Sequence, residues 1–256
     1  MILNHKSSFG QKVRQWLLKS KGLLVSTGEA CLICGKTARV AALCDACLSG
    51  IPWIKEIHCT TCGRYEECYD CSRRMNTYFV SNRSAVQYDE VMKSVLAMYK
   101  YRGDERLLPL FVNMLSKAYE RMLLDLQAVD LNHRIDFITY APLSEQRQLE
   151  RGFNQAEQMA QGISHRYKIP VIPLLSRRLH TQKQSLKARS NRLSDLQHAF
   201  EVNFVGLDVL RQTGGPKPCI VLIDDIYTTG STLNECARTI RNAIPDARIY
   251  GLSWAR

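Results

Sequence analysis

The sequence predicts an α/β protein: a mostly parallel sheet flanked by helices, preceded by a small four-cysteine zinc-ribbon module. Two observations predict this arrangement. Strand-like apolar runs alternate with helical spacing from about residue 80 to residue 256, and eight cysteines are concentrated between residues 31 and 71. Strands that alternate with helices favour a parallel sheet, at whose carboxyl edge ligands bind. A chain of 256 residues has room for one large domain and a small one.

The eight cysteines form four Cys-x-x-Cys pairs, and two such pairs supply the four thiolates of a tetrahedral zinc site. Neighbouring pairs are expected to share an ion, although an interleaved pairing and a contribution from His58 remain open. A disulfide cluster is disfavoured because the chain shows no secretory signal and reduced thiols are expected in the cytoplasm. The predicted ligands are Cys31, Cys34, Cys44 and Cys47 for one structural zinc ion and Cys59, Cys62, Cys68 and Cys71 for the other.

Three segments are expected along the chain: a basic N-terminal extension over 1–30, the double zinc-ribbon module over 31–75 and the α/β domain over 80–256. Residues 9–25 have the pattern of a short amphipathic basic helix. The module has few core-sized apolar runs, so bound metal must supply much of its folding free energy.

The formal net charge of +11 favours polyanionic partners such as nucleic acid or phosphorylated metabolites. Eight zinc-bound thiolates and two Zn²⁺ lower this charge to +7. The basic residues are unevenly placed, since Gln158 to Ser194 contains eight Lys and Arg residues and no acid. No apolar run approaches the roughly 20 residues that span a bilayer, so a cytoplasmic protein without membrane insertion is expected.

Hydrophobic periodicity places the elements of the α/β domain. Strands are expected at 84–88, 136–143, 171–175, 219–225 and 247–255, and helices at 89–100, 105–125, 153–167 and 231–244. The run CIVLIDD over 219–225 is the clearest strand, because it is continuously apolar and is bounded by Pro218 and by charge.

Two carboxylates and an anion-binding turn lie together at the end of that strand. Asp224 and Asp225 end the apolar run, and Thr228, Thr229, Gly230, Ser231 and Thr232 form a turn that opens a helix. The free N–H groups and positive dipole end of a helix N-terminus bind phosphate, and the carboxylates accept hydrogen bonds from sugar hydroxyls. Thr232 and Glu235 also have the spacing of a capping box. A ribose phosphate fits this divided site, whereas an ordinary capped helix is the alternative.

The stretch VLIDDIYTTGST over 221–232 resembles the phosphoribosyl-pyrophosphate (PRPP) motif of type I phosphoribosyltransferases. Three further stretches, KYRGD (100–104), APLSEQRQLERGFNQAE (141–157) and TQKQSLKARSNR (181–192), resemble the ComF competence-protein family. That family carries a cysteine-pair zinc module before its phosphoribosyltransferase domain. The resemblance covers residues 31–256 and implies the type I phosphoribosyltransferase fold.

The resemblance also implies roles for individual residues. Asp224 and Asp225 would bind the ribose hydroxyls and take part in catalysis, and Thr228 to Thr232 would bind the 5-phosphate. Leu143, Ser144 and Arg147 would lie beside the pyrophosphate, with Arg151 as a further anion partner. Lys183 and Arg189 would belong to a flexible loop over the site, or to a basic surface loop. Asn154 and Gln155 either cap the following helix or line the pocket.

The function implied is PRPP binding with Mg²⁺ in natural competence, the uptake of transforming single-stranded DNA, together with transfer of phosphoribose to an unspecified acceptor. The expected partners are PRPP, single-stranded DNA and a competence ATPase that translocates DNA. One alternative is a non-catalytic module that senses PRPP or binds single-stranded DNA, with stacking from Tyr99, Tyr101 and Phe153, although each of these aromatics singly is more typical of a core. Another is that the zinc ribbons serve as a docking platform on the uptake machinery.

Overall fold

The computed structural model describes residues 30–38, 42–178 and 198–256. Its contacts divide the chain into two compact units, Met1–Pro52 and Trp53–Arg256. The helix expected over 9–25 lies outside the described residues, as do Lys183 and Arg189. No helix within the described ranges is both long enough and apolar enough to cross a membrane.

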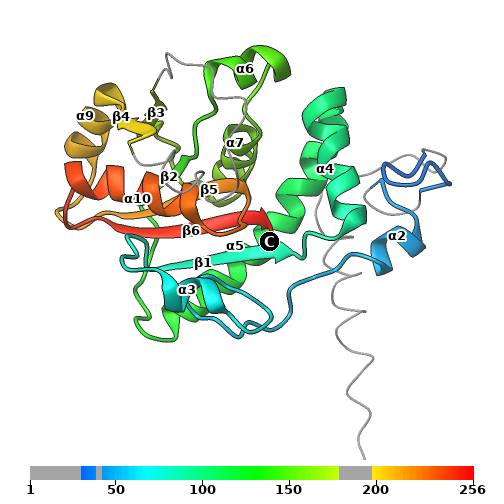
Figure 1. Cartoon of the computed structure of the whole chain (residues 1–256), viewed down its shortest axis with the longest axis horizontal. Helices are drawn as coiled ribbons and strands as arrows, with labels where there is room; N and C mark the ends of the chain where they lie inside the picture. The colour runs from blue at the N-terminus through cyan, green and yellow to red at the C-terminus, as the bar shows by residue number, and fades with distance from the viewer. Residues whose placement is uncertain (1–29, 39–41, 179–197) are drawn as a thin grey trace, which may run out of the picture. The chain divides into compact units, whose positions relative to one another are not determined.

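The second unit is built around a four-stranded sheet in which every neighbouring pair of strands is parallel (Figure 1). The strand order is β1-β6-β5-β2. The α/β fold with a parallel sheet predicted from the sequence is therefore confirmed. The strands are β1 (Ser81–Val86), β2 (Phe137–Tyr140), β5 (Cys219–Ile226) and β6 (Arg248–Ala255), and β3 (Leu175–Arg177) and β4 (Phe200–Val202) form a separate antiparallel pair.

Helices pack against the sheet. Helix α5 packs on β1 and β6, α7 packs on β2 and β5, and α10 contacts β3, β4 and β5. The first unit contains α2 (Asp45–Ser49). The second contains α3 (Tyr69–Arg73), α4 (Glu90–Arg102), the 3-10 turn η1 (Glu105–Leu107), α5 (Leu108–Gln127), α6 (Glu145–Arg151), α7 (Gln155–Tyr167), α9 (Phe204–Thr213) and α10 (Ser231–Ala243).

The core of the second unit explains why the strand over 219–225 is so clear in the sequence. Ile220, Val221, Leu222 and Ile223 are fully buried, because strands flank β5 on both sides and helices pack against it. A strand that is covered on both faces is apolar at every position, not only at alternate ones.

Three sequence predictions need correction. The first strand begins at Ser81 and not at residue 84, because Asn82 and Arg83 are buried polar residues that hid it. The strand expected at 171–175 is reduced to one bridge between Val171 and Ile138, and β3 begins only at Leu175. Helices α6 and α9 and strand β4 were not expected, since each is short.

The buried polar groups of β1 find their partners in the chain that precedes this strand and in α5. The Asn82 N–H donates to the Thr61 carbonyl over 2.7 Å, and the Ile54 N–H donates to the Ala85 carbonyl over 3.0 Å. Arg83 donates to the Asp125 carboxylate over 2.8 Å and to the Thr60 carbonyl over 2.9 Å. Residues 54–61 thus cover an edge of the sheet that would otherwise expose unpaired backbone groups.

Candidate functional site

The candidate site lies at the carboxyl edge of the parallel sheet, where β5 and β2 end beside each other. The Ala141 N–H, just after β2, donates to the Ile223 carbonyl of β5 over 2.9 Å. The loops that follow the two strands therefore begin side by side. The first loop leads through Ser144 into α6, which carries Arg147, and the second leads through Thr228 to Gly230 into α10, which begins with Ser231 and Thr232.

The turn after β5 has the geometry expected of an anion-binding helix start. Gly230 has φ +77° and caps α10, which begins at Ser231. The Thr229 and Ser231 hydroxyls are 2.7 Å apart, and the first N–H groups of α10 have no carbonyl of their own helix to bind. The predicted capping box is wrong, because Glu235 accepts from the His198 N–H over 2.7 Å and from Arg238 instead.

Asp224 and Asp225 lie near the end of β5, and each has a different partner. The Asp225 carboxylate forms an ion pair with the ammonium of Lys100 at the end of α4, and both side chains are largely buried. The Asp224 carboxylate accepts a hydrogen bond from the Asp225 N–H over 2.9 Å. Lys100 is the first residue of the KYRGD stretch, but its pairing with Asp225 joins positions 125 residues apart and could not be derived from spacing.

Desolvation and, after it, the neighbouring charge of Asp225 raise the pKa of Asp224 to about 7, against the opposing effects of the Asp225 N–H, Lys100 and Arg147. Near neutral pH this carboxyl is thus poised between its two protonation states. A carboxyl with a strongly raised pKa beside a second carboxylate is typical of a functional site. In its ionised form the Asp224 carboxylate would be stabilised most by a ligand that brings hydroxyl donors or a cation.

Two arginines approach Asp224. Arg147, on α6, lowers the pKa of Asp224 by its positive charge. Arg177, at the end of β3, has its own pKa lowered by desolvation and by the charge of Arg147. Because the guanidinium groups of Arg147 and Arg177 repel each other, an anion bound between them would be favourable. Arg177 was not among the predicted site residues, and its place in the acid-free run was the only signal of it in the sequence.

The loop after β2 is held by two caps. Ser144 caps α6 by accepting from the Arg147 N–H at 3.4 Å, and Leu143 precedes it. Asn154 caps α7 by accepting from the Ala156 N–H, and its amide donates to the Ala141 carbonyl over 3.1 Å. Of the two roles left open for Asn154, the structure therefore shows the cap. Gln155 is buried and accepts from Arg151 over 2.9 Å.

The three aromatic residues considered for base stacking differ in exposure. Tyr99 is fully buried and packs against Phe111 and Phe153. Tyr101 is 72% exposed, and the Arg151 guanidinium carbon lies 5.3 Å from the centre of its ring. Only Tyr101 of the three thus presents an open aromatic surface.

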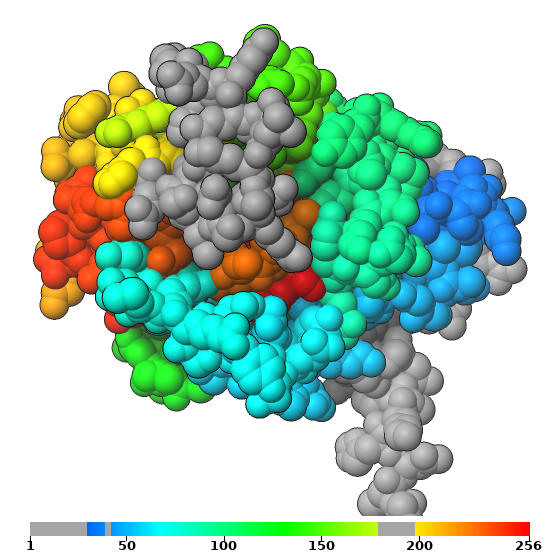
Figure 2. All heavy atoms as spheres, in the orientation of Figure 1, coloured from blue at the N-terminus to red at the C-terminus, as the bar shows by residue number. Residues whose placement is uncertain are grey.

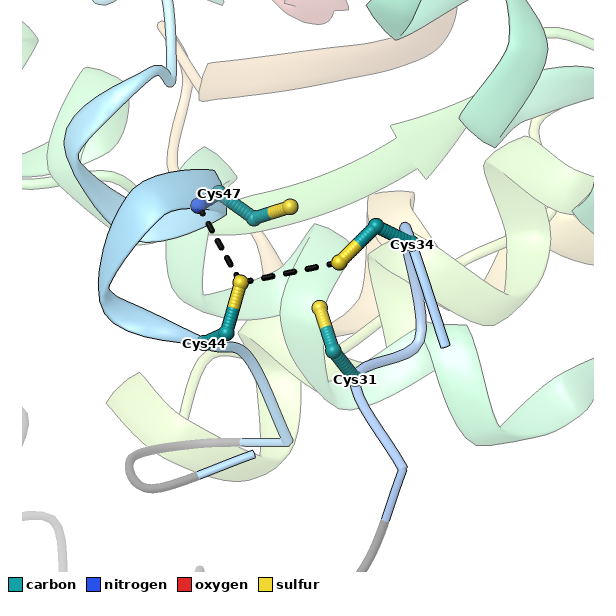
Figure 3. A group of neighbouring side chains, drawn as sticks. All are labelled: Cys31, Cys34, Cys44 and Cys47. Carbon is teal, nitrogen blue, oxygen red and sulfur yellow. Dashed lines mark hydrogen bonds between the residues drawn. The ribbon is translucent and has the colours of Figure 1, made fainter. Parts of the chain in front are cut away.

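The cysteines form two clusters that follow the order of the sequence. In each cluster the four sulfurs lie within 4.8 Å of one another. Figure 3 shows the first, in which the Cys31 and Cys34 side chains face those of Cys44 and Cys47 at the start of α2. Four convergent thiols are the donor set of a tetrahedral structural metal site, so both clusters could hold a metal ion such as zinc.

The second cluster, formed by Cys59, Cys62, Cys68 and Cys71, belongs to the same unit as the sheet. Cys62 is fully buried within the hydrophobic core that also contains Phe79 and Tyr227. Its carbonyl accepts from Asn82 of β1 over 3.2 Å. This cluster is therefore integrated with the α/β domain.

A parallel sheet with paired carboxylates, flanking arginines and a helix-opening turn at its carboxyl edge defines a class: α/β proteins that bind a ligand where their strands end. Here that domain is combined with cysteine clusters suited to metal. Comparison with known proteins gives the particular family.

The chain is 30% identical to Competence protein ComFC of Bacillus subtilis over 207 residues, covering 77% of each chain. It is also 30% identical to Competence protein ComFC of Streptococcus pneumoniae over 241 residues, covering 87% of this chain and 98% of the relative. Competence protein F of Haemophilus influenzae is 24% identical over 239 residues, covering 91% and 93%. The chain belongs to the ComF family of competence proteins.

Two solved structures of adenine phosphoribosyltransferases are similar in part. The Saccharomyces cerevisiae enzyme gives a TM-score of 0.31 at 14% identity, covering 56% of this chain and 69% of the enzyme. Another gives a TM-score of 0.30 at 12% identity, covering 56% and 79%. No family model matches the sequence.

Proposed function

We propose that this protein binds PRPP with Mg²⁺ at the carboxyl edge of its sheet and transfers phosphoribose during natural competence. The observation that carries the proposal is the junction of Asp224 and Asp225 with the Thr228–Thr232 turn at the end of one strand. Membership of a competence-protein family supports the process, and the resemblance of residues 221–232 to the PRPP motif supports the ligand.

The charges of the site suit the three parts of PRPP. The 5-phosphate would bind the N–H groups and hydroxyls of Thr228 to Thr232. The ribose hydroxyls would donate to Asp224 and Asp225, and the pyrophosphate would bind Arg147. Arg177, whose pKa is lowered beside Arg147, would gain an anionic partner at the same place.

Transfer would break the bond between the anomeric carbon and pyrophosphate, which leaves, and would form a bond between that carbon and a nucleophilic atom of the acceptor. Asp224 and Asp225 would stabilise the positive charge that develops on the ribose, and Arg147 would stabilise the departing pyrophosphate. Mg²⁺, held mainly by PRPP oxygens and water, would supply further positive charge at the leaving group. Lys183 and Arg189, which lie outside the described residues, are proposed to close over the site and exclude water.

Calorimetric titration with PRPP tests the site. We expect Asp224→Asn/Asp225→Asn to weaken binding by about 100-fold, because two charged hydrogen-bond acceptors are lost. Asp208→Asn is the control, since Asp208 is an exposed carboxylate on α9. Titrations contain Mg²⁺, and a Mg²⁺-free comparison leaves the ion out of the buffer instead of adding a chelator, which would also remove metal from the cysteine clusters. Equal affinity of the double variant and the wild type would overturn the assignment.

Transferase activity is tested by pyrophosphate release. The protein is incubated with PRPP, Mg²⁺ and, in separate reactions, free bases and single-stranded DNA. Release that depends on one acceptor identifies the reaction. Tight PRPP binding without release in any mixture would favour a non-catalytic sensor of PRPP.

In competence the protein is proposed to act in the cytoplasm beside the ATPase that translocates DNA, with its zinc-holding clusters as docking surfaces. The first cluster is the better candidate, because the second is integrated with the sheet. We expect Cys34→Ser/Cys47→Ser to lose co-purification with the ATPase while keeping PRPP affinity. Unchanged co-purification would refute docking through this cluster.

A second candidate function, binding of single-stranded DNA, is favoured by the exposed Tyr101 beside Arg151. Bases stack on exposed aromatic rings, and nearby guanidinium groups bind phosphates. We expect Tyr101→Ala to weaken binding of an oligonucleotide about tenfold. Phe204→Ala is the matched control, because Phe204 is similarly exposed on α9. Binding should also fall steeply with salt, and absence of binding at low salt rejects this function.

A further inference from the structure

Arg74 extends from the second cysteine cluster to the turn after β5. It follows α3 and lies three positions after Cys71. Its Nη2 donates to the Thr229 carbonyl and, over 3.3 Å, to the Tyr227 hydroxyl. In Figure 2 the cyan segment that carries α3 adjoins the orange segment of β5 and α10 on the same face of the molecule. Residues 155 positions apart in the sequence are thus in direct contact.

The contact with Thr229 fixes the direction of a peptide group. In a trans peptide the C=O and the following N–H point in opposite directions. Because Arg74 holds the Thr229 carbonyl, the Gly230 N–H must point to the other side of this peptide plane. Gly230 has φ +77°, and a Cβ at this position would lie 2.8 Å from Arg74 Nη2. The Tyr227 hydroxyl, 2.1 Å from that Cβ position, and the Arg74 guanidinium together occupy the space that the missing side chain leaves.

A second connection runs from the same cluster to the same turn. The Cys62 carbonyl accepts from Nη1 of Arg256 over 3.0 Å, and the Arg256 guanidinium carbon lies 4.4 Å from the centre of the Tyr227 ring. Tyr227 is only 3% exposed, and its N–H donates to the Ala255 carbonyl of β6. Tyr227 thus lies between two arginines. Arg74 follows the last cysteine of the second cluster, and Arg256 binds the carbonyl of Cys62 in that cluster.

Other partners of Arg74 do not account for its position. Its guanidinium carbon lies 5.5 Å from the centre of the Phe79 ring, which is a packing contact. Within the described part of the chain, no carboxylate is paired with Arg74, and its buried Nη1 has no hydrogen-bond partner. The hydrogen bonds that the Arg74 side chain does make go to Tyr227 and Thr229, which flank Thr228.

We propose that Arg74 is a positioning residue through which the second cysteine cluster, with its metal bound, sets the conformation of the anion-binding turn. Loss of metal from Cys59, Cys62, Cys68 and Cys71 then lowers the affinity of the turn for phosphate. This inference rests on the proposed function for its ligand. It assigns the second cluster a role in ligand binding in addition to its role in folding.

Amide hydrogen exchange tests the proposal without any ligand. In Arg74→Gln we expect exchange to accelerate about tenfold or more at the Tyr227 and Asn234 N–H groups, which donate to the Ala255 and Gly230 carbonyls on either side of the turn. This is the effect of losing one charged hydrogen bond on a local opening equilibrium. Exchange in the buried strand β6 should stay unchanged, which shows that the domain remains folded. Arg73→Gln, an exposed neighbour at the end of α3, is the matched control.

Calorimetric titration with PRPP supplies the second measurement. We expect about tenfold weaker binding in Arg74→Gln, partial recovery in Arg74→Lys, which still donates to one carbonyl, and wild-type affinity in Arg73→Gln. Cys68→Ser/Cys71→Ser should repeat the exchange pattern of Arg74→Gln, with one metal ion fewer per chain. If the double cysteine variant fails to fold, the amide exchange and PRPP affinity of Arg74→Gln decide whether Arg74 positions the turn.

The two proposals fail in different ways. If the wild type binds no PRPP, the proposed function fails, and exchange at the turn still reports whether Arg74 positions it. If the wild type binds PRPP, and Arg74→Gln matches Arg73→Gln in both exchange and affinity, the positioning role is overturned. Weaker binding without faster exchange at the turn would also overturn it, because Arg74 would then act only as a ligand of the phosphate.

Discussion

The ammonium of Lys100 forms an ion pair with the carboxylate of Asp225, and the two side chains are only 12% and 16% exposed. The pair joins the end of α4 to the end of β5. It also places a positive charge beside two adjacent carboxylates, which would otherwise repel each other. Lys100 thus offsets the repulsion between Asp225 and Asp224 in the absence of ligand.

Replacing Lys100 by methionine should destabilise the domain. Near pH 8 we expect the free energy of unfolding to fall by about 2 kcal/mol, since a partly buried carboxylate loses its partner. Near pH 6 the loss should be smaller, because protonation of Asp224 relieves the repulsion. Urea unfolding measures both values. Lys93→Met is the control on the same helix, because water and salt screen its exposed pair with Glu90 and its loss should change stability little. Equal effects of the two substitutions would contradict a special role for Lys100.

The raised pKa of Asp224 makes stability depend on pH. This carboxyl binds a proton more tightly in the folded state, where its pKa is about 7, than in the unfolded state. Protonation of Asp224 therefore stabilises the folded state fully at low pH, and this stabilisation is lost as the pH rises through 7. Between about pH 6 and about pH 8 we expect the wild type to lose about 1 kcal/mol relative to Asp224→Asn.

Denaturant unfolding of the wild type and Asp224→Asn across this interval measures the difference. The interval stays above the acidic range in which thiolate ligands would be protonated and metal lost. Parallel pH profiles for the two proteins would show that Asp224 is not the titrating group. Asp224→Asn should be more stable than the wild type near pH 8 and yet bind PRPP poorly.

Substituting Gly230 by alanine should damage both stability and anion binding. Its φ is +77°, and a Cβ would lie 2.1 Å from the Tyr227 hydroxyl oxygen. We expect a loss of about 2 to 3 kcal/mol in the free energy of unfolding and no measurable PRPP binding. Gly103→Ala separates strain from collision, because Gly103 has φ +63° and no atom within 4 Å of its Cβ position. Gly103→Ala should lower the free energy of unfolding by only about 1 kcal/mol. An equal loss in Gly103→Ala and Gly230→Ala would contradict the collision with Tyr227.

The two cysteine clusters should differ in their effect on the α/β domain. Metal analysis should give two ions per chain, and Cys34→Ser/Cys47→Ser and Cys59→Ser/Cys62→Ser should each retain one. The second variant should also lose about 3 kcal/mol or more in the free energy of unfolding of the sheet domain, because Cys62 lies in its core. The first variant should leave that transition unchanged. An equal loss from both variants would contradict the integration of the second cluster with the sheet.

The sequence by itself determined what depends on residues close together in the chain. The Cys-x-x-Cys spacing predicted two groups of four thiols, and the apolar run before Asp224 predicted the central strand and the turn that follows. These features need only a few consecutive residues, and each has a geometry that its residue types impose. The parallel α/β architecture followed from the alternation of such segments.

Only the tertiary structure decided which distant residues meet. Lys100 reaches Asp225, Arg177 approaches Asp224 and Arg74 contacts Thr229, although nothing in the local pattern of a lone basic residue distinguishes it from a solvated one. The start of β1 was missed for the same reason, because buried polar residues are satisfied by partners remote in sequence. Contacts between distant residues depend on how helices and strands pack against one another. Hydrophobic periodicity along the sequence does not encode this packing.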